Sequence, residues 1–98
     1  MEIRESGRSG SVIYFEGAEN ITFHWEFCGG ETVASIWIGE SGEWNARHPW
    51  AAGWRQEILE HIAEEVVRLK APTCSALIEE RSGFIAIKQR PAGSEQRQ

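Results

Sequence analysis

Residues 21–28 alternate strictly between apolar and polar side chains, and this pattern limits the possible folds more than any other feature of the chain. Its large apolar residues share one side of an extended chain: Ile21, Phe23, Trp25 and Phe27. A period of two residues predicts a strand with one buried face. The segments 11–16 and 32–38 on either side are also rich in β-branched and aromatic residues. The sequence therefore predicts three consecutive strands.

The Gly-Gly pair at 29–30 predicts how the second and third strands pair. Two adjacent glycines suit a two-residue hairpin turn, because both of its residues need a positive φ. With Cys28 opposite Glu31, Trp25 falls opposite Ala34, so that the largest side chain faces the smallest. A shift by one residue would turn every apolar side chain to the other face. We therefore expect a well-defined register here.

The first hairpin is expected to close through a three-residue loop at 18–20. In that register Phe15 faces Phe23, and Ile13 faces Trp25. Both hairpins then direct their large apolar side chains to the same face of the sheet. The expected result is a three-stranded meander with one face ready to be covered.

One amphipathic helix and a second hairpin complete the predicted fold. Residues 39–48 are expected to form a loop, and 50–69 repeat apolar residues at helical spacing until Pro72 prevents further helix. Segments 74–80 and 84–89 are expected to pair with Ile78 opposite Ile85 and Ala76 opposite Ile87. The order βββαββ predicts an α+β fold, a two-layer sandwich in which one helix covers one face of a five-stranded antiparallel sheet.

The length of 98 residues predicts one domain, 11–89, between a flexible arm at 1–10 and a disordered tail at 90–98. The net charge is −5, and no Lys or Arg occurs between Arg8 and Arg47, where the chain carries six glutamates. Such an acidic surface repels nucleic acid. No apolar run is long enough to span a membrane, and no secretory signal is evident, so a cytoplasmic protein without nucleic-acid or membrane partners is expected.

The face of the sheet away from the helix is the first candidate site. The predicted registers place Tyr14, His24 and Ser35 in one cross-strand row, with Glu26 and Trp37 nearby. A solvated face normally carries polar side chains, so exposed Trp and Tyr indicate an interface with a protein partner or a second copy of the chain. Cover by loops or termini, and a small-molecule site, are the alternatives.

Residues 44–55 are the second candidate site, because they hold three Trp, two Arg and one His. In the functional interpretation Trp44, Arg47, His48 and Trp50 surround an anionic or ring-shaped ligand beside the helix N-terminus. In the structural interpretation these tryptophans close the core. Trp54 is in phase with the apolar stripe of the helix and is expected to be buried.

Neither a metal centre nor a catalytic site is predicted. His24, Glu26 and Cys28 alternate along one strand, and side chains two residues apart diverge too far to share one metal ion. No nucleophile motif is present, and no cofactor is implied. The sequence predicts a non-enzymatic protein-interaction domain, such as an inhibitor or antidote of a basic protein. The alternative is a small-molecule-binding domain or minor enzyme using residues 44–55.

Overall fold

The computed structural model describes residues 1–90 of the chain as an α+β fold. Its strands form one six-stranded antiparallel sheet in the order β1-β2-β3-β4-β6-β5. The strands are β1 (Glu2–Ser6), β2 (Ser9–Glu16), β3 (Glu19–Phe27), β4 (Thr32–Trp37), β5 (Cys74–Glu79) and β6 (Phe84–Gln89). The helices are α1 (Ser41–Arg47), a 3₁₀ turn η1 (Pro49–Ala51) and α2 (Arg55–Lys70). Apart from Arg90, the predicted tail 90–98 lies outside the described residues.

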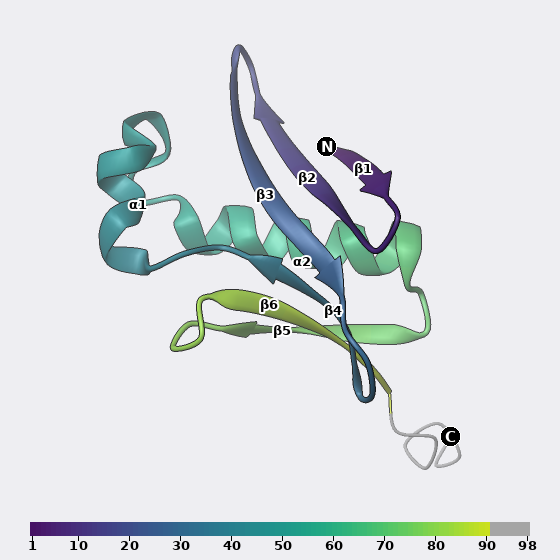
Figure 1. Cartoon of the computed structure of the whole chain (residues 1–98). Coiled ribbons are helices and arrows are strands. Elements are labelled where there is room, and N and C mark those ends of the chain that lie inside the picture. Colours follow the sequence, from purple (N-terminus) through teal and green to yellow (C-terminus); the bar gives the residue numbers. More distant parts are fainter. Residues whose placement is uncertain (91–98) are drawn as a thin grey trace, which may run out of the picture.

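Helix α2 lies across one face of the sheet, and α1 lies to one side of it (Figure 1). Its buried residues Ile58 and Ile62 meet Ile36 and Ile85 of the central strands in one hydrophobic core. The apolar stripe predicted for this segment is therefore the packed face of α2. Figure 1 also shows that β1, β2 and β3 cross in front of α2, so the other face of the sheet is turned toward the viewer.

The sheet has six strands where five were predicted, because residues 2–6 of the expected arm pair with β2 as strand β1. Gly10 of β2 makes this arrangement possible. The Trp25 side chain passes beside Gly10 and donates its indole N–H to the Arg4 carbonyl at 3.2 Å. A Cβ atom at position 10 would lie 1.9 Å from that carbonyl oxygen. Glycine thus lets a large indole hold the outer strand in place.

The predicted register between β2 and β3 is wrong, and with it the predicted inner face of β2. The strands close at Glu16 and Glu19 around a two-residue turn in which Gly17 has a φ of 61°, instead of through the loop 18–20. Val12 then lies opposite Phe23. Because this register differs from the expected one by an odd number of residues, the side chains of β2 exchange faces. Val12 is buried under α2, whereas Phe15 is 49% exposed.

The other two hairpins keep the predicted faces. Trp25 lies opposite Ile36 instead of Ala34, a shift of two residues that leaves Phe23, Trp25 and Ile36 buried. The turn is longer than expected, because Cys28 donates its N–H to the Val33 carbonyl at 2.9 Å. In the last hairpin, Ile78 lies opposite Ile85 and Ala76 opposite Ile87. That register is confirmed.

Two helices replace the single predicted one. Part of the expected loop 39–48 forms α1, and α2 begins at Arg55, after η1 and a turn at Gly53. Trp54 is the residue before α2 and is 58% exposed, so its predicted burial is wrong. The buried face of the helix starts one turn later, at Ile58 and Leu59.

Candidate functional site

The predicted row of Tyr14, His24 and Ser35 does not form. Tyr14 lies opposite Ile21 on the face that α2 covers, while His24 pairs with Ser11 on the open face. Ser35 lies opposite Glu26 instead. The hydroxyl of Ser35 is 3.2 Å from the Cys28 sulfur, and His24 Nε2 is 3.8 Å from a Glu26 carboxylate oxygen. The centre of the open face is therefore polar.

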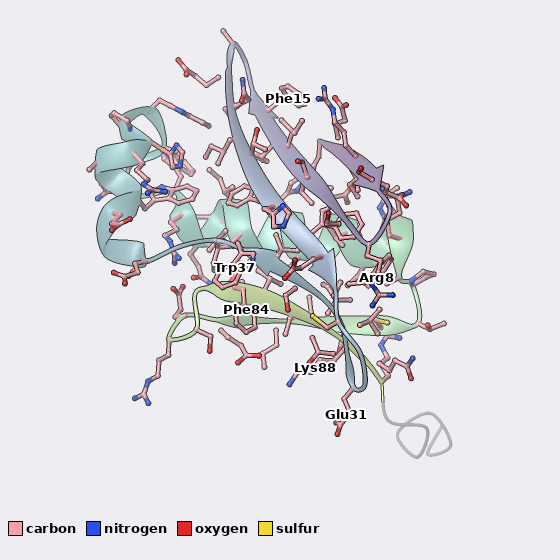
Figure 2. All side chains as sticks on the ribbon, in the orientation of Figure 1. Arg8, Phe15, Glu31, Trp37, Phe84 and Lys88 are labelled. Atoms are coloured by element: carbon pink, nitrogen blue, oxygen red, sulfur yellow. The ribbon has the colours of Figure 1, made fainter. Side chains whose placement is uncertain are left out.

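Aromatic side chains gather at one end of the open face. Trp37 lies opposite Phe84, with the two rings edge-on at 5.8 Å between centroids. Figure 2 shows these two labelled side chains together, with Phe15 well apart from them. The predicted exposure of Trp37 is found, but Tyr14 is not beside it. The open face therefore lacks the continuous aromatic surface on which the predicted interface depended.

Trp44 belongs to the core and also borders the cavity between α1 and the sheet. Its side chain is only 4% exposed and stacks on Phe23, with 6.4 Å between ring centroids. Its indole N–H donates to the Ala51 carbonyl at 2.9 Å, which holds η1 against α1. Arg55 completes the cluster, with its guanidinium 5.8 Å from the centre of the Trp44 ring. The structural interpretation therefore holds for Trp44.

The guanidinium of Arg55 is also hydrogen-bonded within the fold. Its guanidinium donates to both carboxylate oxygens of Glu80, at 2.7 and 2.6 Å, and to the Gly39 carbonyl at 3.2 Å. This bidentate pair ties the start of α2 to the turn between β5 and β6. These contacts use the two terminal nitrogens of Arg55, while its buried Nε has no hydrogen-bond partner among the described residues.

Arg47 and His48 line a cavity of about 280 Å³ between α1 and the sheet, together with His24 and Trp37. Arg47 lies 3.6 Å from Glu43, which lines the same cavity. Burial lowers the pKa of His48 below its usual value, and the charge of Arg47 lowers it further. This cavity brings together several predicted residues, and its lining carries one arginine and two glutamates, Glu40 and Glu43. Trp50 lies elsewhere, in a cavity shared with Tyr14.

A groove of about 1,060 Å³ lies between α2 and β5. One wall is the side of α2 that carries Ala63 and Val67, next to glutamates 60 and 64. The other wall is β5 itself, from Cys74 to Ile78. An extended segment beside β5 would therefore meet small apolar side chains along the helix and two carboxylates above them.

Along the outer edge of β5 lie backbone groups that no strand of the described part of the chain pairs with. Gln89 donates its N–H to Glu31 at 3.4 Å, on the β4 side of β6. Because successive residues of a strand direct their N–H and C=O groups to opposite sides, Lys88 and Ala86 bond to β5 instead. Their partners Ser75 and Leu77 therefore face β6. The backbone groups of the residues between and beyond, Ala76 and Ile78, point outward, and no strand in residues 1–90 pairs with them.

The two edges of the sheet differ in protection. At the other edge, β1 places Glu2, Arg4 and Glu5 along its five residues, and charged side chains discourage pairing with another chain. Strand β5 carries no charge before Glu79, and Leu77 is 53% exposed on its open-face side. Within residues 1–90, this apolar edge beside a groove has the features of a strand-addition site.

None of the predicted site residues lies in this groove. The sequence of segment 74–79 predicts a strand but not its position in the sheet. The strand lies at the edge because β6 pairs between β4 and β5. That order is a property of the tertiary fold. The uncharged run before Glu79 was the only signal in the sequence.

No protein-family model, curated protein or solved structure matches the chain. Among the described residues, no helix is both long and apolar enough to cross a membrane. Residues 1–90 also contain no group of three or more His, Cys or Glu side chains placed to hold a metal ion.

Proposed function

We propose that this protein is an interaction domain that binds an extended, basic segment of another protein along the outer edge of β5. The observation that carries the proposal is the pair of outward-facing residues Ala76 and Ile78, whose backbone groups line a groove beside α2. A bound segment would add a seventh strand about 4.8 Å from β5, and its backbone would supply the missing hydrogen bonds.

The groove also indicates the side chains of the partner. Ala63 and Val67 leave room for medium-sized apolar residues on the helix side. Glu60 and Glu64 border the same wall. Of the two arginines in the lining, Arg68 is paired with Glu65 at 2.7 Å, and Arg90 is exposed. A segment that alternates apolar residues with Lys or Arg complements this surface. The net charge of −5 further favours association with a basic partner.

A second copy of the chain is a poorer occupant. Pairing of β5 with β5 of another molecule is symmetric about Leu77, with Ala76 opposite Ile78. That arrangement brings Glu60 and Glu64 of the two α2 helices to the same junction. Each copy also carries a net charge of −5, so self-association is opposed at low ionic strength. The electrostatics favour a basic heterologous segment.

Replacement of Ala76 by proline tests the proposal. Proline removes the outward N–H of an edge strand and leaves the ladder between β5 and β6 intact. A random heptapeptide display library is selected on the native protein, and the enriched peptides are measured by titration against native and Ala76→Pro protein. We expect enriched peptides that alternate apolar and basic residues and bind Ala76→Pro at least about tenfold more weakly, the loss of roughly 1.4 kcal/mol.

Charge reversal supplies the matched control. Glu64→Lys is expected to weaken the same peptides, whereas Glu19→Lys, at the start of β3 and outside the groove lining, leaves their affinity within about twofold after correction for net charge. Peptide-induced NMR shifts should be largest in β5 and the facing side of α2. Equal binding to native and Ala76→Pro protein, or shifts centred on Trp37, would show that the site lies elsewhere.

A further inference from the structure

The cavity shared by Trp50 and Tyr14 has a volume of about 430 Å³ and lies on the other side of α2 from the groove, where the end of β2 and η1 meet the first turns of the helix. Its walls carry three aromatic residues, two carboxylates and one histidine: Tyr14, Trp50, Trp54, Glu16, Glu57 and His61. No Lys or Arg side chain lines it. The volume falls in the lower part of the roughly 300–1,000 Å³ range of small-ligand sites.

The local fold holds these aromatic residues around one space. Tyr14 reaches the helix side because of the observed register of β2, and its ring meets His61 edge-on at 5.8 Å. The hydroxyl of Tyr14 donates to the Glu16 carboxylate at 2.6 Å. That hydrogen bond, with burial and the charge of Glu16, raises the pKa of Tyr14 above its usual value. The phenol is therefore neutral at physiological pH and its ring keeps an electron-rich face.

Trp50 and Trp54 are brought together by a turn between η1 and α2. Gly53 takes a φ of 84°, a conformation that a residue with a side chain rarely adopts, and its N–H donates to Asn45 at 3.3 Å. The buried Trp44 holds the last residue of η1, because its indole N–H donates to the Ala51 carbonyl. Trp54 remains more than half exposed, although a shorter or polar residue would suffice to precede a helix. Its exposure is accounted for if its ring faces a ligand.

The charges select the sign of that ligand. Aromatic faces attract cations, and Glu16 and Glu57 add negative charge beside them. The N-terminal end of α2 carries a partial positive charge, which Glu57 in its first turn offsets. Because no metal-holding cluster exists among residues 1–90, an inorganic cation lacks the ligands it needs. A methylated ammonium group suits aromatic walls and nearby carboxylates better than a strongly hydrated metal ion does.

We propose that this cavity binds a methylated ammonium group, held between the rings of Trp50, Trp54 and Tyr14 with Glu57 as counter-charge. The group can belong to a free choline-like molecule or to a methylated lysine side chain. The site is independent of the groove along β5, because it is formed by the first turns of α2 and by β2. Failure of one proposal therefore leaves the other standing.

The test is titration with choline chloride, followed by the indole N–H signals of the tryptophans in NMR spectra. The neutral isostere 3,3-dimethyl-1-butanol is titrated in parallel, and KCl controls for ionic strength. We expect saturable shifts at Trp50 and Trp54 with choline and at least tenfold weaker binding of the alcohol. Trp54→Leu should weaken choline binding roughly 3- to 30-fold, as expected for the loss of one cation–π contact.

Two further variants distinguish binding at this cavity from nonspecific binding of choline to the protein surface. Glu57→Gln should weaken choline binding about two- to fivefold at low salt. Trp37→Leu removes a comparably exposed tryptophan on the open face and should leave the affinity unchanged. Equal binding of the neutral alcohol, or unchanged choline affinity in Trp54→Leu, overturns the proposal.

The source of the ammonium group is distinguished by a peptide carrying trimethyllysine and its unmodified counterpart. If the methylated peptide binds much more tightly than choline and causes additional NMR shifts in η1, the ammonium group recognised by the site belongs to a protein. Equal affinity of choline and the methylated peptide assigns it to a free small molecule. Tighter binding of the unmodified lysine peptide contradicts recognition of a methylated group.

Discussion

Replacement of Gly10 by alanine should weaken the fold by detaching β1. The added Cβ atom would lie 1.9 Å from the Arg4 carbonyl oxygen and 2.8 Å from the Trp25 ring. Real Cβ atoms essentially never come closer than 3.0 Å to another heavy atom, so the backbone of β1 must retreat by about 1.1 Å, the difference between 3.0 and 1.9 Å. A backbone carbonyl cannot rotate away as the end of a side chain does.

The expected cost follows from what that displacement breaks. The Trp25 indole loses its hydrogen bond to Arg4, and the pairing of Glu5 with Gly10 is disturbed. Overpacking of a fitted site costs about 1–3 kcal/mol. For a domain of this size, about 2 kcal/mol lowers Tm by roughly 8–16 °C.

The assay is urea unfolding followed by tryptophan fluorescence, together with amide hydrogen exchange of β1. Gly29→Ala is the matched control, because a Cβ atom at position 29 meets nothing within 4 Å and Gly29 has no positive φ. We expect early exchange of β1 amides in Gly10→Ala alone. A stability within about 0.5 kcal/mol of the native protein, with unchanged exchange in β1, would refute the argument.

Two other predictions concern the cluster around Trp44. Trp44→Phe leaves the Ala51 carbonyl without its donor in a buried site and should reduce the free energy of unfolding by about 2–4 kcal/mol, whereas Trp37→Phe on the open face should cost under about 1 kcal/mol by the same urea assay. The pKa of His48 is lower in the folded protein than its usual 6.5, so the unfolded chain binds more protons, and stability should fall as pH drops below about 6.5. Thermal unfolding of His48→Gln between roughly pH 5 and 7 should show a smaller decrease, and an identical pH dependence in both proteins would contradict this assignment.

The sequence was sufficient for the elements with one apolar face and insufficient where both faces are apolar. In β3 only one side of the strand is apolar, and Ile21, Phe23 and Trp25 on that side are buried as predicted, whereas Phe27 at the end of the strand is 44% exposed. Strand β2 has Val12 and Tyr14 on one side and Ile13 and Phe15 on the other, so alternation could not select the inner face. The absence of a side chain at Gly10, opposite Trp25, was the one signal for the observed register.

The sites were harder to predict than the strands because each combines segments distant in the sequence. The cavity at Tyr14 forms because of the observed register of β2 and because the turn at Gly53 places Trp54 outside the core. The groove needs β5 at the edge of the sheet. Tyr14 and Trp50 were predicted as candidates on two separate surfaces, and the structure places both in one cavity. The composition indicated an acidic surface suited to a basic partner, but it did not indicate the positions of the groove and the cavities.

The position of β6 has a consequence for how the chain is made. Strand β6 is synthesised after every other described element, yet it lies inside the sheet between β4 and β5. A nascent chain that has reached Glu79 therefore contains β4 and β5 without the strand that lies between them. Ile36 and Ile78 then both lack Ile85, the residue opposite each of them in the finished sheet. During synthesis, the part of the sheet formed by β4, β6 and β5 can therefore assemble only after the final hairpin has been made. Premature termination before Phe84 leaves an apolar surface of the kind that chaperones and proteases recognise.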